Sequence, residues 1–174
     1  MGLATDPEPA KLGRLRRSSM LRLAFFVLVT VFLVFGALGA YGVRHGEVSA
    51  TGAGFELSVR YPTITRPGLA SVWTVEVRRT DGAPLDGPVV LATTADYFDL
   101  YDENGLDPAP ASEWSDGENL VWELDPAEGA TAVVVHFDAR IEPGVQLSSK
   151  SATTVLLVDG ASVATVTYRT RVMP

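Results

Sequence analysis

The chain of 174 residues contains no cysteine. A disulfide, a lipoprotein anchor on a cysteine and a cysteine-ligated zinc site are therefore all excluded. Histidine is also scarce: His45 and His136 are the only two, too few for a zinc site or for a nucleophile paired with an imidazole base. Any folded part must be stabilised by a hydrophobic core.

Motifs that carry catalysis are lacking as well. No glycine-rich phosphate loop is present, and Lys150 among Ser148, Ser149 and Ser151 lacks the glycine pattern of an oxyanion hole. Carboxylates are plentiful, but a glycosidase needs two of them in a rigid cleft, which small β-sandwiches rarely have. We expect a protein that is not an enzyme and that uses no cofactor.

Basic residues are unevenly distributed. Residues 1–44 carry six Lys and Arg against two acidic residues, whereas residues 45–174 carry eight against nineteen, a net charge of −11. This acidity argues against nucleic acid or anionic lipid as a partner of the second part. Arginine outnumbers lysine twelve to two, and Ala, Gly and Val are abundant, which is typical of a GC-rich bacterial genome.

The longest apolar run, residues 23–43, has 21 residues without a charge. As a helix it would extend about 31 Å, the thickness of a bilayer's hydrocarbon core. Five basic residues between Lys11 and Arg22 precede it, which predicts a cytoplasmic N-terminus and a single-pass protein of the cell membrane. The alternative is a cleaved secretory signal, although this run is longer than the usual signal core.

The segments beside this run are expected to lack regular structure. Residues 1–22 are rich in charge and poor in large apolar side chains, which predicts a disordered cytoplasmic tail. Residues 44–54 consist largely of Gly, Ala, Ser and Thr and predict a flexible stalk.

From Phe55 onward apolar and polar residues alternate, as they do in half-buried strands. Asp159-Gly160 joins the last two strands as a two-residue hairpin turn. No amphipathic helix separates the strands. Residues 55–174 therefore predict one extracytoplasmic, antiparallel β-sandwich of seven or eight strands, with Trp73 and Trp122 in its core.

The order of segments resembles the Ig-like conserved-repeat modules of bacterial cell-surface proteins. The resemblance lies in SVWTVEVRR, in PVVL, and in LVWELDPAEGATAVVVHFDARI followed by a closing hairpin. It implies that Trp122 packs in the core and that Gly129 makes the turn into the next strand. Thr80-Asp81-Gly82 stands where these modules usually have Asn-x-Gly. The resemblance implies a fold and a surface location, but no activity.

A long polar segment, residues 96–119, is expected to form an acidic loop. No basic residue occurs between Arg79 and Arg140, whereas fourteen acidic residues do. Oxygen ligands of this kind suit Ca²⁺, and the weak candidates are Asp99, Asp102, Asn104 and Asp107. The EF-hand pattern is not met, and the favoured interpretation is a solvated loop without metal.

Trp114, within this loop, has two interpretations. Exposed, it would anchor a partner together with Asp102 and Glu103; tucked under the loop, it would cap the core, and we expect the cap. The function predicted from these features is a membrane-anchored interaction module, an accessory subunit or envelope scaffold that contacts another membrane or envelope protein. The alternative is a surface sensor that binds Ca²⁺ or carbohydrate.

Overall fold

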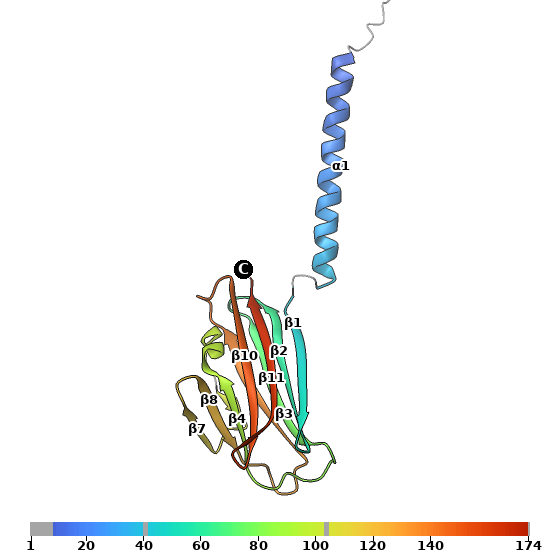
Figure 1. Cartoon of the computed structure of the whole chain (residues 1–174). Coiled ribbons are helices and arrows are strands. Elements are labelled where there is room, and N and C mark those ends of the chain that lie inside the picture. The colour runs from blue at the N-terminus through green and yellow to red at the C-terminus, as the bar shows by residue number, and fades with distance from the viewer. Residues whose placement is uncertain (1–8, 40–41, 103–104, 174) are drawn as a thin grey trace, which may run out of the picture. The chain divides into compact units, whose positions relative to one another are not determined.

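The computed structural model describes residues 9–39, 42–102 and 105–173, with side chains from residue 19 onward. The chain divides into two compact units, residues 1–42 and residues 43–174. The first holds a helix and the second is built from β-strands (Figure 1).

The helix of the first unit, α1, runs from Pro9 to Ala37. Its segment Ser19–Ala37 is the one described helix long and apolar enough to cross a membrane, and its length and composition suit a secretory signal equally. Phenylalanines 25, 26 and 32 are more than 60% exposed, so this surface requires an apolar environment.

Both ends of this helix differ from the ends predicted for the span, residues 23 and 43. It ends at Ala37 instead of residue 43, because Gly39 adopts a left-handed conformation (φ 71°) and donates its N–H to the Gly36 carbonyl. At the other end residues 9–22 are helical, so the disordered tail predicted for residues 1–22 is wrong there. Adding turns to an existing helix costs little, and Pro9 is tolerated in a first turn. Residues 1–8 of that prediction lie outside the described residues.

The described residues of the second unit form eleven strands and one short 3₁₀ helix, η1. The sheet order is β5-β9-β3-β2-β11-β10-β4-β8-β7, with β1 paired to β2 and β6 paired to β9. The elements are β1 (Arg44–Gly52), β2 (Phe55–Thr65), β3 (Ala70–Arg79), β4 (Val89–Thr94), η1 (Ala95–Leu100), β5 (Tyr101–Asp102), β6 (Leu106–Asp107), β7 (Ser112–Ser115), β8 (Asn119–Leu124), β9 (Ala132–Ile141), β10 (Ser148–Val158) and β11 (Ala161–Val172).

These strands form one continuous sheet that curls into a half-barrel, in place of the separate sheets of the predicted sandwich. The all-β class after an N-terminal helix is confirmed, but the count of seven or eight strands is too low. The sheet is continuous because Arg171 and Val172 of β11 pair in parallel with Ile64 and Thr65 of β2. Each of the other described strand pairs is antiparallel.

The predicted stalk is a strand. β1 pairs with β2 from Arg44 opposite Ile64 to Gly52 opposite Phe55, while Val48 and Ala50 pack against the core. Its small residues allow close packing: a side chain at Gly52 would collide with the Val163 carbonyl of β11. Residues 44–52 are therefore ordered, and the prediction of a flexible stalk is wrong because composition alone does not distinguish these two uses of glycine.

The long loop is also more ordered than predicted. It contains most of η1 together with β5, β6 and β7, and residues 97–100 belong to η1. The 3₁₀ turn buries Tyr97, Phe98 and Leu100, and it leaves Asp96 and Asp99, three positions apart, on the outer side. A strand would have placed Asp99 on the same face as Tyr97, so burial of the aromatic ring favours the helical turn.

Two other sequence predictions are confirmed. Trp73 is fully buried and Trp122 is 3% exposed, and their ring centroids lie 6.0 Å apart. Asp159-Gly160 forms the hairpin between β10 and β11, with both residues at positive φ. The curl of the sheet explains the tryptophan contact, because β3 and β8 lie far apart in the strand order.

A candidate binding surface at the seam of the curled sheet

The two ends of the curled sheet approach each other at a place that we call the seam. One side is β9 with β5 and β6, the other is β8 with β7, and η1 fills the space between them. Phe98 of η1 contacts both sides: its ring centroid lies 5.3 Å from that of Trp122 and 5.2 Å from that of Phe137. At the seam, core residues such as Phe98 lie next to the terminal strands of the sheet, β5 and β7.

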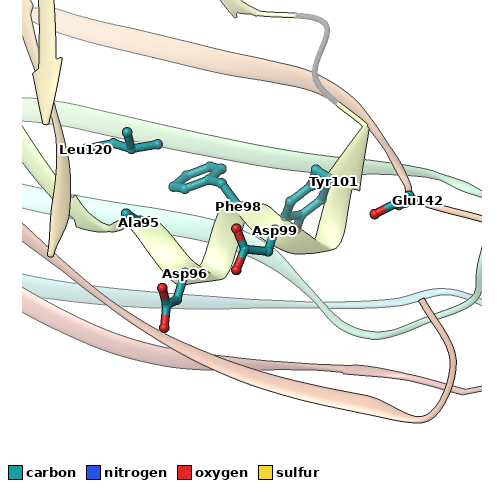
Figure 2. A pocket seen from close by; sticks show the side chains of 7 residues that line it. All are labelled: Ala95, Asp96, Phe98, Asp99, Tyr101, Leu120 and Glu142. Carbon is teal, nitrogen blue, oxygen red and sulfur yellow. The ribbon is translucent and has the colours of Figure 1, made fainter. Parts of the chain in front are cut away.

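An open pocket of about 460 Å³ lies over η1 (Figure 2). Phe98, Tyr101 and Leu120 contribute its apolar lining, and Asp96, Asp99 and Glu142 contribute carboxyl groups. Among the described residues no group of three or more His, Asp or Glu side chains is placed to hold a metal ion. The pocket combines an apolar wall with negative charge, which favours a cationic or amphipathic ligand over an anion.

A smaller cavity of about 100 Å³ opens beside it, lined by Leu106, Glu113, Trp122 and Phe137, among others. Within the described part of the chain, Nε1 of Trp122 is the single buried side-chain nitrogen or oxygen without a hydrogen-bond partner. Its counterpart Trp73 donates Nε1–H to the Tyr168 hydroxyl at 2.9 Å. A buried N–H without an acceptor is costly, so this position favours an acceptor from outside the chain, such as water or a ligand.

Trp114 lies on β7, the terminal strand on this side of the seam, and it is 45% exposed. The expectation that it caps the core is wrong: β7 pairs with β8 at the end of the sheet order, with Trp114 opposite Val121, and almost half of the tryptophan surface stays exposed. The ring adjoins a strand edge without a ladder partner. An exposed tryptophan beside an open edge is a suitable contact for another protein.

A turn stabilised by Asp116 connects β7 and β8, which form a hairpin. Its Oδ1 accepts the N–H groups of Glu118 (2.9 Å) and Asn119 (2.7 Å), and Oδ2 accepts Asn119 Nδ2–H (3.1 Å). These bonds, the side-chain bond from Asn119 first, lower the pKa of Asp116. Sequence reasoning did not single out this residue, although Asp-Gly-x-Asn, here residues 116–119, is a recognisable turn signal.

The predicted acidic cluster is dispersed and partly neutralised. Asp102 pairs with Arg140 of β9 at 2.6 Å, and Asp99 pairs with Lys150 of β10 at 3.3 Å. Asp107 ends β6 opposite His136, and Glu103 and Asn104 lie outside the described residues. The fold therefore brings basic residues to a stretch of sequence that contains none, because β9 pairs with β5 and β10 packs near η1.

Hydroxyl groups form a buried network that the sequence did not reveal. Tyr97 bonds to Tyr101 (3.0 Å) and to Thr170 (2.7 Å), and Thr170 donates to the Pro62 carbonyl. Burial raises the pKa of Tyr97, Tyr101 and Tyr168 well above the ordinary tyrosine value. Tyr97 and Tyr101 are bonded to each other, and the Tyr168 hydroxyl is bonded to Trp73 and Thr154. The raised pKa values favour the neutral phenols, which stabilise the core through these hydrogen bonds.

The solved structures that this chain resembles include two with weak similarity. No protein-family model matches the chain, and no curated protein matches it either. The crystal structure of BslA, described as a bacterial hydrophobin, aligns with a TM-score of 0.42 and 11% identity over 74% of this chain and 99% of that one. The alkylpurine DNA glycosylase AlkC of Pseudomonas fluorescens, bound to DNA, aligns with a TM-score of 0.31 and 13% identity over 79% of this chain and 33% of that one. Neither similarity assigns a function.

Proposed function

We propose that this chain is a membrane-anchored interaction module without catalytic activity, an accessory subunit or scaffold of a bacterial envelope. Its N-terminus would be cytoplasmic, α1 would be retained as a single span, and the β unit would be extracytoplasmic. The basic residues before α1 and the acidic β unit support this orientation. The positive φ of Gly129 (74°) and the buried Trp122 agree with the two positions that the resemblance to Ig-like cell-surface modules singles out, although the strands form one curled sheet.

One observation carries the proposal: Trp114 is exposed on a terminal strand beside the seam. A solvent-exposed tryptophan contributes little to folding, whereas tryptophan is enriched among residues that dominate binding energy. The unpaired edge of β7 offers backbone groups for an added strand next to it. We propose Trp114 and this edge as the contact with another membrane or envelope protein, with Asp102 and Glu103 nearby in sequence as its acidic part.

The proposal is tested by purifying the full chain from membranes in mild detergent and identifying what copurifies. Trp114→Ala is expected to lose the partner, while the matched control Val72→Ala keeps it, because Val72 is similarly exposed (50% against 45%) but lies on β3. Both variants are expected to melt at the temperature of the parent protein. Equal recovery of the same partner with both variants would exclude Trp114 as the contact.

A second candidate function is a sensor for a small ligand, favoured by the unpartnered Trp122 Nε1 beside a cavity. A ligand that supplies an acceptor there would stabilise the folded state by mass action. Melting of the purified chain is measured with and without Ca²⁺ and a panel of glycans. A rise of several degrees favours the sensor, and an unchanged melting temperature favours the interaction module.

A further inference from the structure

We propose that the end of the β unit at which β1 begins binds the headgroup surface of a lipid bilayer. This inference rests on the proposed membrane anchor and adds a second contact, made by the folded domain itself. It concerns four segments, which together we call the β1 end: the start of β1 at Arg44, the turn 66–69, the loop 142–147 and the last residues of β11 with Met173.

Hydrogen bonds and strand register bring these segments together. Gly68 donates its N–H to the Ile141 carbonyl (2.9 Å), and Met173 donates to the Thr65 carbonyl (2.9 Å). Arg44 pairs opposite Ile64, and Ser148, which follows the loop 142–147, pairs opposite Val172. Figure 1 shows the start of β1 and the end of β11 at the same end of the β unit. The β1 end is therefore one continuous surface.

Apolar side chains are exposed on this surface. Leu147 is 80% exposed, and Leu69 and Met173 are each 41% exposed; these are three of the six large apolar side chains that the described β unit exposes. Leu147 also has a positive φ of 42°, a conformation that disfavours a bulky residue. Neither its conformation nor its exposure benefits folding, which points to a contact outside the chain.

Positive charge accompanies these apolar groups. The four segments contain Arg44, Arg66 and Arg171 against one acidic residue, Glu142. At the opposite end, the connections 80–88, 125–131 and 159–160 hold five acidic residues and no basic one. The net charge of −11 is therefore unevenly distributed: the four segments of the β1 end carry more basic than acidic residues, and the opposite connections carry only acidic ones. Arginine with leucine and methionine is the composition of surfaces that attract anionic headgroups and insert shallowly between them.

The length of the connection identifies lipid as the occupant. α1 ends at Ala37 and β1 begins at Arg44, so the connection 38–43 has six residues and reaches about 20 Å at most. The β1 end is thus the part of the domain that the chain holds within reach of the bilayer surface. The effective concentration of headgroups there is high, so even weak contacts become occupied.

The test uses the full chain reconstituted in vesicles of phosphatidylcholine with phosphatidylglycerol, some of the lipid carrying a headgroup quencher. Because the chain has no cysteine, Gln146→Cys beside Leu147 and Ala127→Cys at the opposite end each give a single site for a fluorescent label. We expect quenching several-fold stronger at position 146 than at position 127. Combining Gln146→Cys with Arg66→Gln and Arg171→Gln, or with Leu147→Ser, should reduce it toward the value at position 127.

Two failures are distinguishable. If the chain does not float with the vesicles in a density gradient, the anchor itself is wrong. If it floats but the label at position 146 is quenched no more than that at position 127, the domain does not bind lipid and the anchor stands. Quenching that changes with the ratio of protein to lipid would identify a second copy of the chain as the occupant and overturn the proposal. Thermal melting confirms that each variant is folded.

Discussion

At the scale of single residues, the two core tryptophans differ in their hydrogen bonding. Trp73 donates to Tyr168, and Trp122 has no acceptor among the described residues. Replacing either with Phe removes a similar volume, but Trp73→Phe also removes a satisfied bond. We expect Trp73→Phe to lower the free energy of unfolding by about 1 kcal/mol more than Trp122→Phe. Urea denaturation of both variants measures the difference.

The same urea denaturation is applied to variants in which either tryptophan is replaced by Ala, and it gives their free energies of unfolding. Each should cost about 3–5 kcal/mol, because a large buried ring leaves a cavity that the surrounding strands refill only in part. A loss below about 1 kcal/mol for either variant would contradict the burial of that ring. An equal cost for the two Phe variants would show that Trp122 has an acceptor in solution.

Asp116 gives a prediction with a defined pH dependence. Its folded-state pKa is lowered from the ordinary 3.8 by hydrogen bonds to its carboxylate, so the turn is fully stabilised above pH 3.8 and loses that stabilisation as the pH falls through the lower value. We expect Trp114 fluorescence to report loosening of the β7–β8 hairpin below pH 3.8. The Asp116→Ala variant should show the loosened signal already at neutral pH, whereas Asp159→Ala, in another turn, should not.

At the scale of elements, the packing of β1 against β11 requires that position 52 has no side chain. A Cβ at Gly52 would overlap the backbone of β11, whereas a Cβ at Gly144 would meet only the Glu142 carboxylate at 3.5 Å. Gly52→Ala is therefore expected to destabilise the domain by about 1–3 kcal/mol, and Gly144→Ala by less than about 0.5 kcal/mol. Thermal melting measures both. A neutral Gly52→Ala variant would indicate that β1 is not packed against β11.

Sequence pattern predicted the elements whose signals are local. Alternation identified the strands with Trp73 and Trp122, and Asp159-Gly160 identified the last hairpin. It failed where the deciding contact is distant in sequence. The use of Gly52 depends on Val163, the neutralisation of Asp102 depends on Arg140, and the single curled sheet depends on Ile64 meeting Arg171. The exposure of Trp114 likewise depends on the sheet order, which periodicity does not specify.

At the scale of the whole molecule, the proposed topology predicts which part a protease reaches. Basic residues precede α1 and the β unit is acidic, so protease added to intact spheroplasts should digest residues beyond the span. Immunoblotting with a C-terminal tag follows the digestion, and a cytoplasmic protein serves as the control for intact cells. Protection of the tag until the membrane is permeabilised would reverse the orientation.

If α1 is the anchor proposed above, its short connection to β1 has a mechanical consequence. A load applied at the far turns of the domain, such as that at Asp159-Gly160, would pull against an anchor attached before Arg44, so tension would run along the strands. The hydrogen bonds between β1 and β2 lie across that direction, from Arg44 opposite Ile64 to Gly52 opposite Phe55. They would bear the load together in shear instead of opening one after another. In the proposed anchored state, the pairing of β1 with β2 would therefore resist unravelling at the point of attachment.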